Sequence, residues 1–395
     1  MTVVAKITTE TPTGPEMIAR ARALIPTLKA RALQTEHDRR LPKETIADMQ
    51  NAGLFRVVQP RRWGGYELDI LTYYECQMAL AEGDMSVGWV HGVVGVHPWL
   101  VAQYDDRAQH EVWGKDNATL VCSSLMPAGV ATPVEGGFRL TGRWKYSSGS
   151  DHCGWAFLGG VVSPEDRRIF LVPRSDYQIV DTWHVSGLKG TGSHDIVIKD
   201  AFVPEHRTHK FDDAFHARAP GHAVNTAMLY HLPFGQIFFR GVSTAAIGAL
   251  QAMLDAYLDY GKARINRVQG TRAADDPGIQ LLCAETATAI DEMKTILHRN
   301  FRNLEDYAAR HELPPLPQRI QYKFHSAWVA ERSQQLAARL FKAAGAAGIY
   351  DDYPFGRMLA DITTARQHVS NQFEQAGKSA GAALFGPVEN KDLVI

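Results

Sequence analysis

The stretch FRLTGRWKYSSG, residues 138–149, decides the fold. Apolar and polar side chains alternate along it, and it ends in Ser-Ser-Gly, which is typical of a strand that runs into a turn. Similar short runs, β-branched and bounded by Gly, Pro, Asp or Ser, surround it: ATLVCSSL at 118–125, WAFLGGVV at 155–162, RIFLVPR at 168–174 and DIVIKDAFVP at 195–204. Together they predict an antiparallel sheet or barrel over residues 118–206.

Helical periodicity lies on both sides of this β region. Residues 15 to about 115 read as helices, and Pro26 is expected to kink or split the first of them. After a polar, His-rich connection, long Ala-rich stretches predict an antiparallel bundle at 237–262, 279–310, 318–347 and 354–384. We therefore predict an α+β, mostly α protein: an N-terminal helical domain (1–117), a middle antiparallel β-barrel (118–206) and a C-terminal four-helix bundle (207–395).

Composition excludes several classes of function. The 395 residues include 42 Lys plus Arg and 43 Asp plus Glu, so no bulk field exists to hold nucleic acid or an anionic membrane. The N-terminus has no apolar signal region and no run approaches the roughly 20 apolar residues of a membrane span, which predicts a soluble cytoplasmic protein. The four cysteines form no C-x-x-C pair and no His or carboxylate pair has metal-ligand spacing, so we predict free thiols and no metal site.

Other common sites are also missing from the sequence. It contains no G-x-G-x-x-G after a strand, no phosphate-binding loop with Gly-Lys-Ser/Thr, and no G-x-S-x-G nucleophile turn. Dinucleotide-binding, nucleotide-hydrolysing and serine-hydrolase functions therefore have no support.

Seven segments resemble the acyl-CoA dehydrogenase superfamily, and they keep their order along the chain. The match is closer to its flavin-dependent monooxygenase branch, whose two-component members hydroxylate p-hydroxyphenylacetate or a steroid-derived phenol. The segments are QPRRWGG (59–65), GWVHGVVGVHPW (88–99), CSSLMP (122–127), GRWKYSSGSDH (142–152), VPRSDYQIVDTWHVSGLKGTGS (172–193), AFVPEHR (201–207), and the tail LFKAAGAA (340–347) with FGRMLADITTARQH (355–368).

The resemblance implies a reaction and its partners. A separate NAD(P)H flavin reductase would deliver reduced flavin, FMNH2 or FADH2, to this oxygenase component. O2 would add at the flavin C4a position, and the resulting hydroperoxide would hydroxylate a phenolic, indolic or fused-ring aromatic substrate. Members are typically homotetramers with flavin bound at subunit contacts.

Four residues are candidates for flavin binding. Ser148 matches the Ser or Thr that meets flavin N5 in this superfamily, with Ser147 beside it, although strand-end hydroxyls also make plain turn bonds. Trp144 is a candidate cover for the ring system or an ordinary core residue. Arg264 matches a residue that reaches the flavin phosphate, commonly from a neighbouring subunit, and Arg267 is its close competitor.

Three residues are candidates for catalysis. His97 would accept a phenol proton, unless it is a satisfied core histidine. Ser123 would bond the substrate hydroxyl, and strand alternation sends Ser124 to the opposite face. His368 takes the place of the dehydrogenases' carboxylate base and would face the flavin C4a region, unless it is a surface histidine on the last helix.

Other readings stay open. His91, about two helical turns from His97, is taken as structural. The GLKGTGS loop at 187–193 would let backbone approach a cofactor, or is a plain hairpin. An acyl-CoA dehydrogenase-like oxidase, an N- or S-oxygenating monooxygenase of the same fold, and a non-catalytic flavin carrier remain the alternatives.

Overall fold

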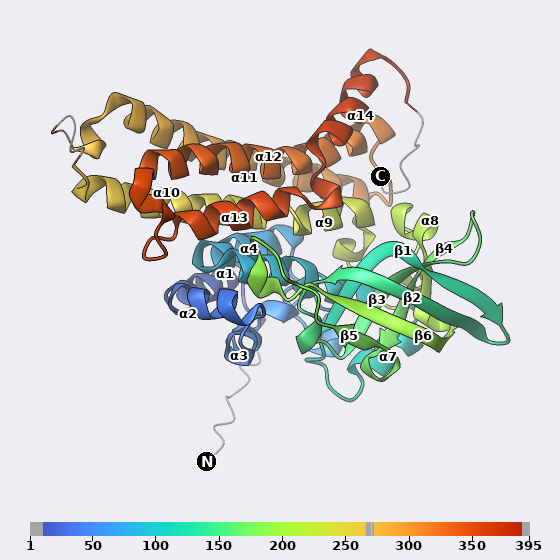
Figure 1. Cartoon of the computed structure of the whole chain (residues 1–395). Coiled ribbons are helices and arrows are strands. Elements are labelled where there is room, and N and C mark those ends of the chain that lie inside the picture. Colours follow the sequence, from blue (N-terminus) through green and yellow to red (C-terminus); the bar gives the residue numbers. More distant parts are fainter. Residues whose placement is uncertain (1–10, 266–269, 271, 389–395) are drawn as a thin grey trace.

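The protein, seen in a computed structural model that describes residues 11–265, 270 and 272–388, has helices at both ends and a sheet in the middle (Figure 1). The N-terminal helices are α1 (Gly14–Ala23), α2 (Ile25–Asp38), α3 (Lys43–Asn51), α4 (Ile70–Gly83), α5 (Met85–Val90), a π-helical turn (His91–Gly95), α6 (His97–Val101) and α7 (Asp106–Trp113).

The predicted break in the first helix is confirmed. Helix α1 ends at Ala23, and α2 begins at Ile25 with Pro26 in its first turn. A proline is tolerated there because its missing N–H would have no partner inside the helix.

The middle of the chain forms a seven-stranded sheet in the order β5-β6-β2-β1-β3-β4-β7. The predicted antiparallel pairing is wrong at one place, because β1 and β3 run parallel. The last strand also lies beyond residue 206, where it pairs with β4. The strands are β1 (Val121–Val134), β2 (Gly137–Ser147), β3 (Trp155–Val161), β4 (Arg167–Pro173), β5 (Gln178–Val180), β6 (His194–Pro204) and β7 (Thr208–Lys210).

The C-terminal helices form the predicted bundle, which lies above the other two parts in Figure 1. The buried helix α4 packs against α10 and joins the N-terminal helices to the bundle. The C-terminal helices are α8 (Phe211–Phe215), α9 (Phe234–Gly241), α10 (Ala245–Ala263), α11 (Pro277–Ala309), α12 (Leu316–Ala344), α13 (Phe355–Arg366) and α14 (Phe373–Phe385).

One predicted helix of the bundle is wrong. The stretch expected to run from 354 to 384 is divided into α13 and α14, and His368 lies in the break. The buried amide of Asn371 stabilises this break by donating to the carbonyls of Ala365 (2.8 Å) and Val242 (3.0 Å). A side chain therefore replaces the backbone donors that a continuous helix would supply.

Among the described residues, Phe234–Ala263 is long and apolar enough to cross a membrane, but 89% of its most apolar window is buried inside the protein. That burial is typical of a core helix.

A buried carboxylate connects the β domain to the bundle. Asp361 of α13 accepts a hydrogen bond from the backbone N–H of Leu188 at 2.6 Å. Burial, together with the nearby carboxylate of Asp84, raises the pKa of Asp361 to about 7, while Arg357 acts in the opposite direction and Glu36 adds to the rise. Burial likewise raises the pKa of Asp84. The folded protein therefore keeps a proton on this pair at pH values where an unfolded chain has lost it.

This proton makes stability depend on pH. Because the folded pKa of Asp361 is raised, the folded state binds an extra proton between about pH 4 and pH 7, and its stability falls as pH rises through that window. Asp361→Asn has no such proton. We expect the wild type to lose on the order of 3–4 kcal/mol relative to this variant between pH 4 and pH 8. Thermal unfolding of both proteins at several pH values measures the difference between their free energies of unfolding. A difference that does not change with pH would contradict the prediction.

Candidate active site

A buried helical stretch between the sheet and the bundle carries two of the site's side chains. Asp84 begins it, because its carboxylate accepts from the N–H groups of Ser86 (2.7 Å) and Val87 (3.4 Å). The π-helical turn then interrupts the regular ladder just before Pro98, which has no N–H to donate. As a result Trp89 and His97 face the β domain from two points of one stretch.

His97 is held in one tautomer. Its Nδ1 donates to the carbonyl oxygen of Val121 at 2.5 Å, so its Nε2 carries a lone pair. That Nε2 is buried and has no partner among the described residues. Burial lowers the pKa of His97 to about 4, and the bond to Val121 opposes the shift. Phe238 stacks on the ring at 5.9 Å and Phe157 meets it edge-on at 5.4 Å. The site therefore offers a neutral acceptor between aromatic walls.

Ser123 lies on the same side of the sheet as Phe157. The two are register partners on β1 and β3, and partners in register project to one face. The ring of Phe157 contacts His97, so Ser123 lies on the His97 face. Ser124 instead donates to the carbonyl of Lys145 at 2.7 Å and is not available there.

A bulge at the end of β2 sets the direction of the two following serines. The register between β2 and β6 shifts between Trp144 and Ser147, and Tyr146 has φ 68°. Such bulges bend a strand and change the direction of its side chains. Ser147 is buried beside Cys122, inside the β domain. Ser148 faces the helical stretch, so we propose Ser148 and not the Ser147 side chain as the cofactor contact.

The Ser148 hydroxyl is part of a buried hydrogen-bond network. It accepts from the indole Nε1 of Trp89 at 3.2 Å and lies 2.7 Å from the Ser193 hydroxyl. Gly149 follows with φ 69°, and its N–H donates to Thr191 at 2.8 Å. A Cβ at Gly149 would come within 3.0 Å of Val90. Glycine at this position thus lets the turn lie directly on the helical stretch.

His368 is held in the opposite tautomer. The backbone N–H of Ser370 donates to its Nδ1 at 3.1 Å, so in the neutral ring Nε2 carries the proton. Burial lowers the pKa of His368 to about 4, which keeps the ring neutral. Its ring meets Trp89 edge-on at 5.7 Å. His368 is therefore a donor beside Trp89, where His97 is an acceptor.

The structure thus brings two groups of candidates to one helical stretch. Ser148 and His368 both contact Trp89. His97 and Ser123 lie at its other end, and His97 follows Trp89 by eight positions, which corresponds to roughly 12 Å of helix. A ring system with a smaller aromatic beside it matches that spacing.

Two predicted flavin contacts lie elsewhere in this chain. The indole of Trp144 donates to the carbonyl of Gly159 at 2.7 Å and is fully buried inside the β domain, so the prediction that it covers a flavin is wrong. Arg264 caps α10, bonds the carbonyl of Ala343 and lies 5.4 Å from the ring of Tyr260. It belongs to the far end of the bundle. Arg267 is outside the described residues.

Sequence reasoning missed several neighbours of the site. Trp89, Ser193 and Thr191 lie within segments quoted for the resemblance, yet no pattern shows that they meet Ser148. Phe238 stacks on His97 from α9, where helical periodicity predicts only a core residue. His91 is structural, as expected: it donates to Leu54 (3.1 Å) and stacks on Tyr73.

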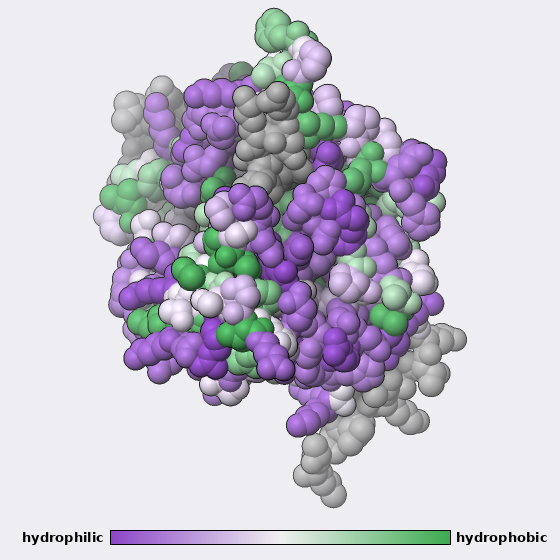
Figure 2. Space-filling view, turned by 90° about the vertical axis from the view of Figure 1, so that its right-hand side faces the viewer, coloured by the Kyte–Doolittle hydropathy of each residue, from purple (hydrophilic) through white to green (hydrophobic). Residues whose placement is uncertain are grey.

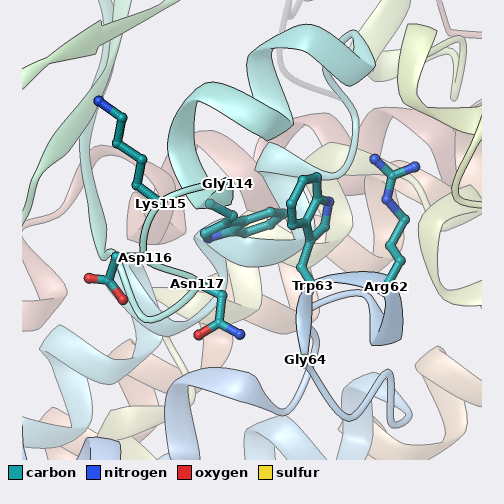
Figure 3. Close-up of a pocket in the computed structure, with 8 residues that line it drawn as sticks. Arg62, Trp63, Gly64, Gly114, Lys115, Asp116 and Asn117 are labelled. Atoms are coloured by element: carbon teal, nitrogen blue, oxygen red, sulfur yellow. The ribbon is translucent and has the colours of Figure 1, made fainter.

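A surface hollow of about 360 Å³ lies apart from these candidates (Figure 3). Two tryptophans and polar side chains line it, including Arg62, Trp63, Lys115 and Asn117. It contains none of the candidate residues, and we assign it no role. In the part of the chain that the structure describes, no cluster of three His, Cys, Asp or Glu side chains is arranged to hold a metal ion.

Comparison with known proteins identifies the family of the chain. Residues 16–119 match the acyl-CoA dehydrogenase N-terminal domain and residues 240–373 an acyl-CoA dehydrogenase C-terminal domain. The chain is 35% identical to the oxygenase subunit HsaA, a flavin-dependent monooxygenase of Rhodococcus jostii, over 93% of this chain and 97% of that protein.

Two further relatives are named for reduced flavin. The oxygenase component of an FADH2-dependent resorcinol hydroxylase from Rhizobium sp. is 30% identical, over 94% of each chain. The structure of XiaF from Streptomyces sp. in complex with FADH2 and glycerol superposes with a TM-score of 0.89 and 25% identity, over 96% of this chain and 97% of that one.

The two tautomers can be observed directly. We expect ¹⁵N NMR of histidine-labelled protein at pH 6 to show His97 as neutral Nδ1–H and His368 as neutral Nε2–H, because burial lowers both pKa values to about 4. Spectra of variants in which His97 or His368 alone is replaced assign the signals to the two rings. A positively charged ring at either position at pH 6 would contradict the assignment.

Proposed function

The chain belongs to the acyl-CoA dehydrogenase family, and within it to the oxygenase subunits of flavin-dependent monooxygenases, and on that premise we propose that it hydroxylates a small phenolic substrate with reduced flavin from a separate reductase. The observation that carries the proposal is the buried Nε2 of His97, which has no partner in the part of the chain that the structure describes and belongs to a ring packed between aromatic side chains. An imidazole acceptor in such a position suits a phenol, whose ring packs on aromatic walls and whose hydroxyl needs an acceptor.

The site residues also fit a reduced flavin. Ser148 keeps a lone pair beside Trp89, and the ring of His368, whose Nε2 carries the proton, also contacts Trp89. Bound reduced flavin supplies the electrons that activate O2 for transfer of one oxygen atom to the substrate. Ser148 would accept from the flavin N5–H, and Trp89 would exclude water from that contact.

The two histidines divide the proton chemistry. His97 Nε2 accepts the phenol proton, which increases the electron density at the ring carbon that takes up oxygen. His368 Nε2–H donates to oxygen on the flavin side of the site. Ser123, on the His97 face, bonds and orients the substrate hydroxyl. Because both imidazoles are neutral above about pH 5, each can perform its role across the physiological range.

The segment before α9 and the first turns of α9 also contribute to the substrate side of the site. Trp99, two residues after His97, donates to the carbonyl of Leu229 at 2.8 Å. Phe234 stacks on Phe238 at 4.4 Å, and Phe238 stacks on His97. These aromatic contacts favour a ring-shaped substrate over an acyl chain.

A reductase partner follows from the same proposal. Relatives of this chain are named oxygenase subunits or components, which implies a separate reductase for each of them. This sequence carries no G-x-G-x-x-G fingerprint for a nicotinamide dinucleotide. We therefore infer an NAD(P)H flavin reductase as partner and a cytoplasmic location, where NAD(P)H is available.

We also infer a homotetramer. Large apolar side chains are exposed on the bundle and its loops: Leu258, Leu281, Trp328, Ile349, Tyr350, Val369, Leu384 and Phe385. Figure 2 shows a largely hydrophilic face, with hydrophobic side chains projecting at the top, where α14 lies in Figure 1. Exposed apolar surface of this kind is typical of subunit contacts. Such contacts would bring Arg264 of one subunit to the flavin phosphate of another.

The proposed activity has a direct test. The purified protein, a general flavin reductase, NADH and either FAD or FMN are incubated with a panel of phenols, indoles and acyl-CoA thioesters under ¹⁸O2. We expect one ¹⁸O atom in a hydroxylated phenol. Acyl-CoA oxidation without oxygen incorporation would overturn the proposal.

His97→Asn supplies the matching variant. Asparagine keeps a donor near the Nδ1 position for Val121 but has no atom at Nε2, so the phenol loses its acceptor. We expect kcat/KM for hydroxylation to fall about 10²–10⁴-fold while the melting temperature changes little. His91→Gln, which alters the structural histidine, should retain hydroxylation. Full activity in His97→Asn would remove His97 from the mechanism.

The tetramer and the Arg264 contact are tested together. Light scattering after gel filtration should give about four times the chain mass of 43.8 kDa. Arg264→Ala should weaken reduced-flavin binding about 10–100-fold, with Arg264→Lys intermediate, because only arginine donates a parallel pair of bonds to phosphate. A monomer that binds reduced flavin tightly, or unchanged affinity in Arg264→Ala, would contradict this arrangement.

A further inference from the structure

Four side chains form a buried row of hydrogen bonds that begins on α5 and ends in the loop before β6. Trp89 Nε1 lies 3.2 Å from Ser148 Oγ, which lies 2.7 Å from Ser193 Oγ. Ser193 Oγ lies 2.7 Å from Thr191 Oγ1, which lies 2.8 Å from the carbonyl oxygen of Leu188. Each of these four residues is buried, with an exposed fraction of 6% or less.

The two ends of the row determine the direction of every bond in it. A carbonyl oxygen only accepts, so Thr191 donates to Leu188. A hydroxyl has one proton, so Thr191 must accept from Ser193, and Ser193 must in turn accept from Ser148. At the other end the indole N–H only donates, so Ser148 accepts from Trp89. Each of the three hydroxyl protons is thereby assigned.

The carbonyl end of the row is held in place. Besides the Thr191 hydroxyl, the Leu188 oxygen accepts from the Thr191 backbone N–H (3.1 Å) and from the Trp183 indole (2.9 Å). On the other side of the same residue, the Leu188 N–H donates to Asp361 at 2.6 Å. Gly192, with φ 52°, makes the tight turn that places Thr191 and Ser193 hydroxyls together. The acceptor therefore cannot turn away from the row.

One lone pair remains on Ser148. Its proton goes to Ser193 and one lone pair takes the Trp89 N–H, so toward the remaining space the hydroxyl can accept but cannot donate. The residues that impose this are Ser193 and Thr191, neither of which needs to touch a ligand.

We propose that Ser193 and Thr191 are positioning residues that make Ser148 a permanent acceptor, so that the site selects reduced flavin over oxidised flavin. This inference rests on the proposed function. Reduced flavin carries a hydrogen on N5 that Ser148 can accept. Oxidised flavin carries a lone pair on N5, which would face the lone pair of Ser148. Discrimination of this kind keeps the oxidised product of one turnover from competing with the next reduced flavin that the reductase releases.

Binding of the two redox forms tests the proposal without turnover. Dissociation constants are measured for oxidised FAD, and anaerobically for dithionite-reduced FAD, by titration of the full-length protein. We expect the wild type to bind the reduced form more tightly. In Ser193→Ala the Ser148 proton loses its acceptor and can turn toward oxidised N5. The ratio of the dissociation constant for oxidised FAD to that for reduced FAD should therefore fall about tenfold.

Matched variants separate this effect from a general loss of packing. Ser193→Thr keeps a hydroxyl and should restore the wild-type ratio. Thr191→Val removes the next acceptor and should lower the ratio in the same direction as Ser193→Ala, but less. Ser243→Ala removes one partner of another buried serine pair, whose hydroxyls lie 2.8 Å apart in the bundle. It should lower the melting temperature without changing the ratio.

The outcomes distinguish this inference from the proposed function. If the wild type binds neither form, the proposed function fails and the inference with it. If the wild type prefers reduced FAD and Ser193→Ala keeps the same ratio, the positioning role is wrong while the proposed function stands. A ratio that falls in Ser193→Ala and returns in Ser193→Thr supports the proposal.

Discussion

The structure depends on one constraint: every residue from Met85 to Val101 except the partly buried Val93 is buried, so the polar side chains of this stretch must find partners in other parts of the chain. Trp89 bonds the turn after β2, His97 bonds the start of β1, and Trp99 bonds the segment before α9. His91 bonds the N-terminal helical part. An unmade bond inside such a core costs about 1–3 kcal/mol, so this single stretch aligns three parts of the protein.

The same burial determines the chemistry of the site. The fully buried imidazole of His97 and the half-buried imidazole of His368 stay neutral, and the backbone then decides which nitrogen of each carries the proton. The Val121 carbonyl makes His97 an acceptor, and the Ser370 N–H makes His368 a donor. No neighbouring carboxylate is required. The division of roles arises from backbone hydrogen bonds that also complete the fold.

Hydrogen bonds to fixed groups also determine the directions of the hydroxyl protons in the β domain. The row from Trp89 to the Leu188 carbonyl has a donor at one end and an acceptor at the other, so its hydroxyls have no freedom of direction. Asp361 holds Leu188 from the bundle, which makes the direction of the Ser148 proton a consequence of how the β domain and the bundle meet. Side chains that do not contact the ligand can thus determine whether the Ser148 hydroxyl presents a donor or an acceptor to it.

The sequence by itself determined the three-part order, because alternation of period two against period 3.6 separates a sheet from helices, and it placed His97, Ser123, Ser148 and His368 in segments that resemble a known family. The break around His368 was hidden, because the donor that stabilises it, Asn371, bonds a carbonyl on a different helix. The sequence favoured Ser148 by its resemblance, but the directions of the Ser147 and Ser148 side chains were decided by a bulge at Tyr146, which only the folded sheet shows. Only the tertiary structure decided the tautomers and the hydroxyl directions, because a hydrogen bond depends on partners that are distant in sequence and meet only in the folded chain.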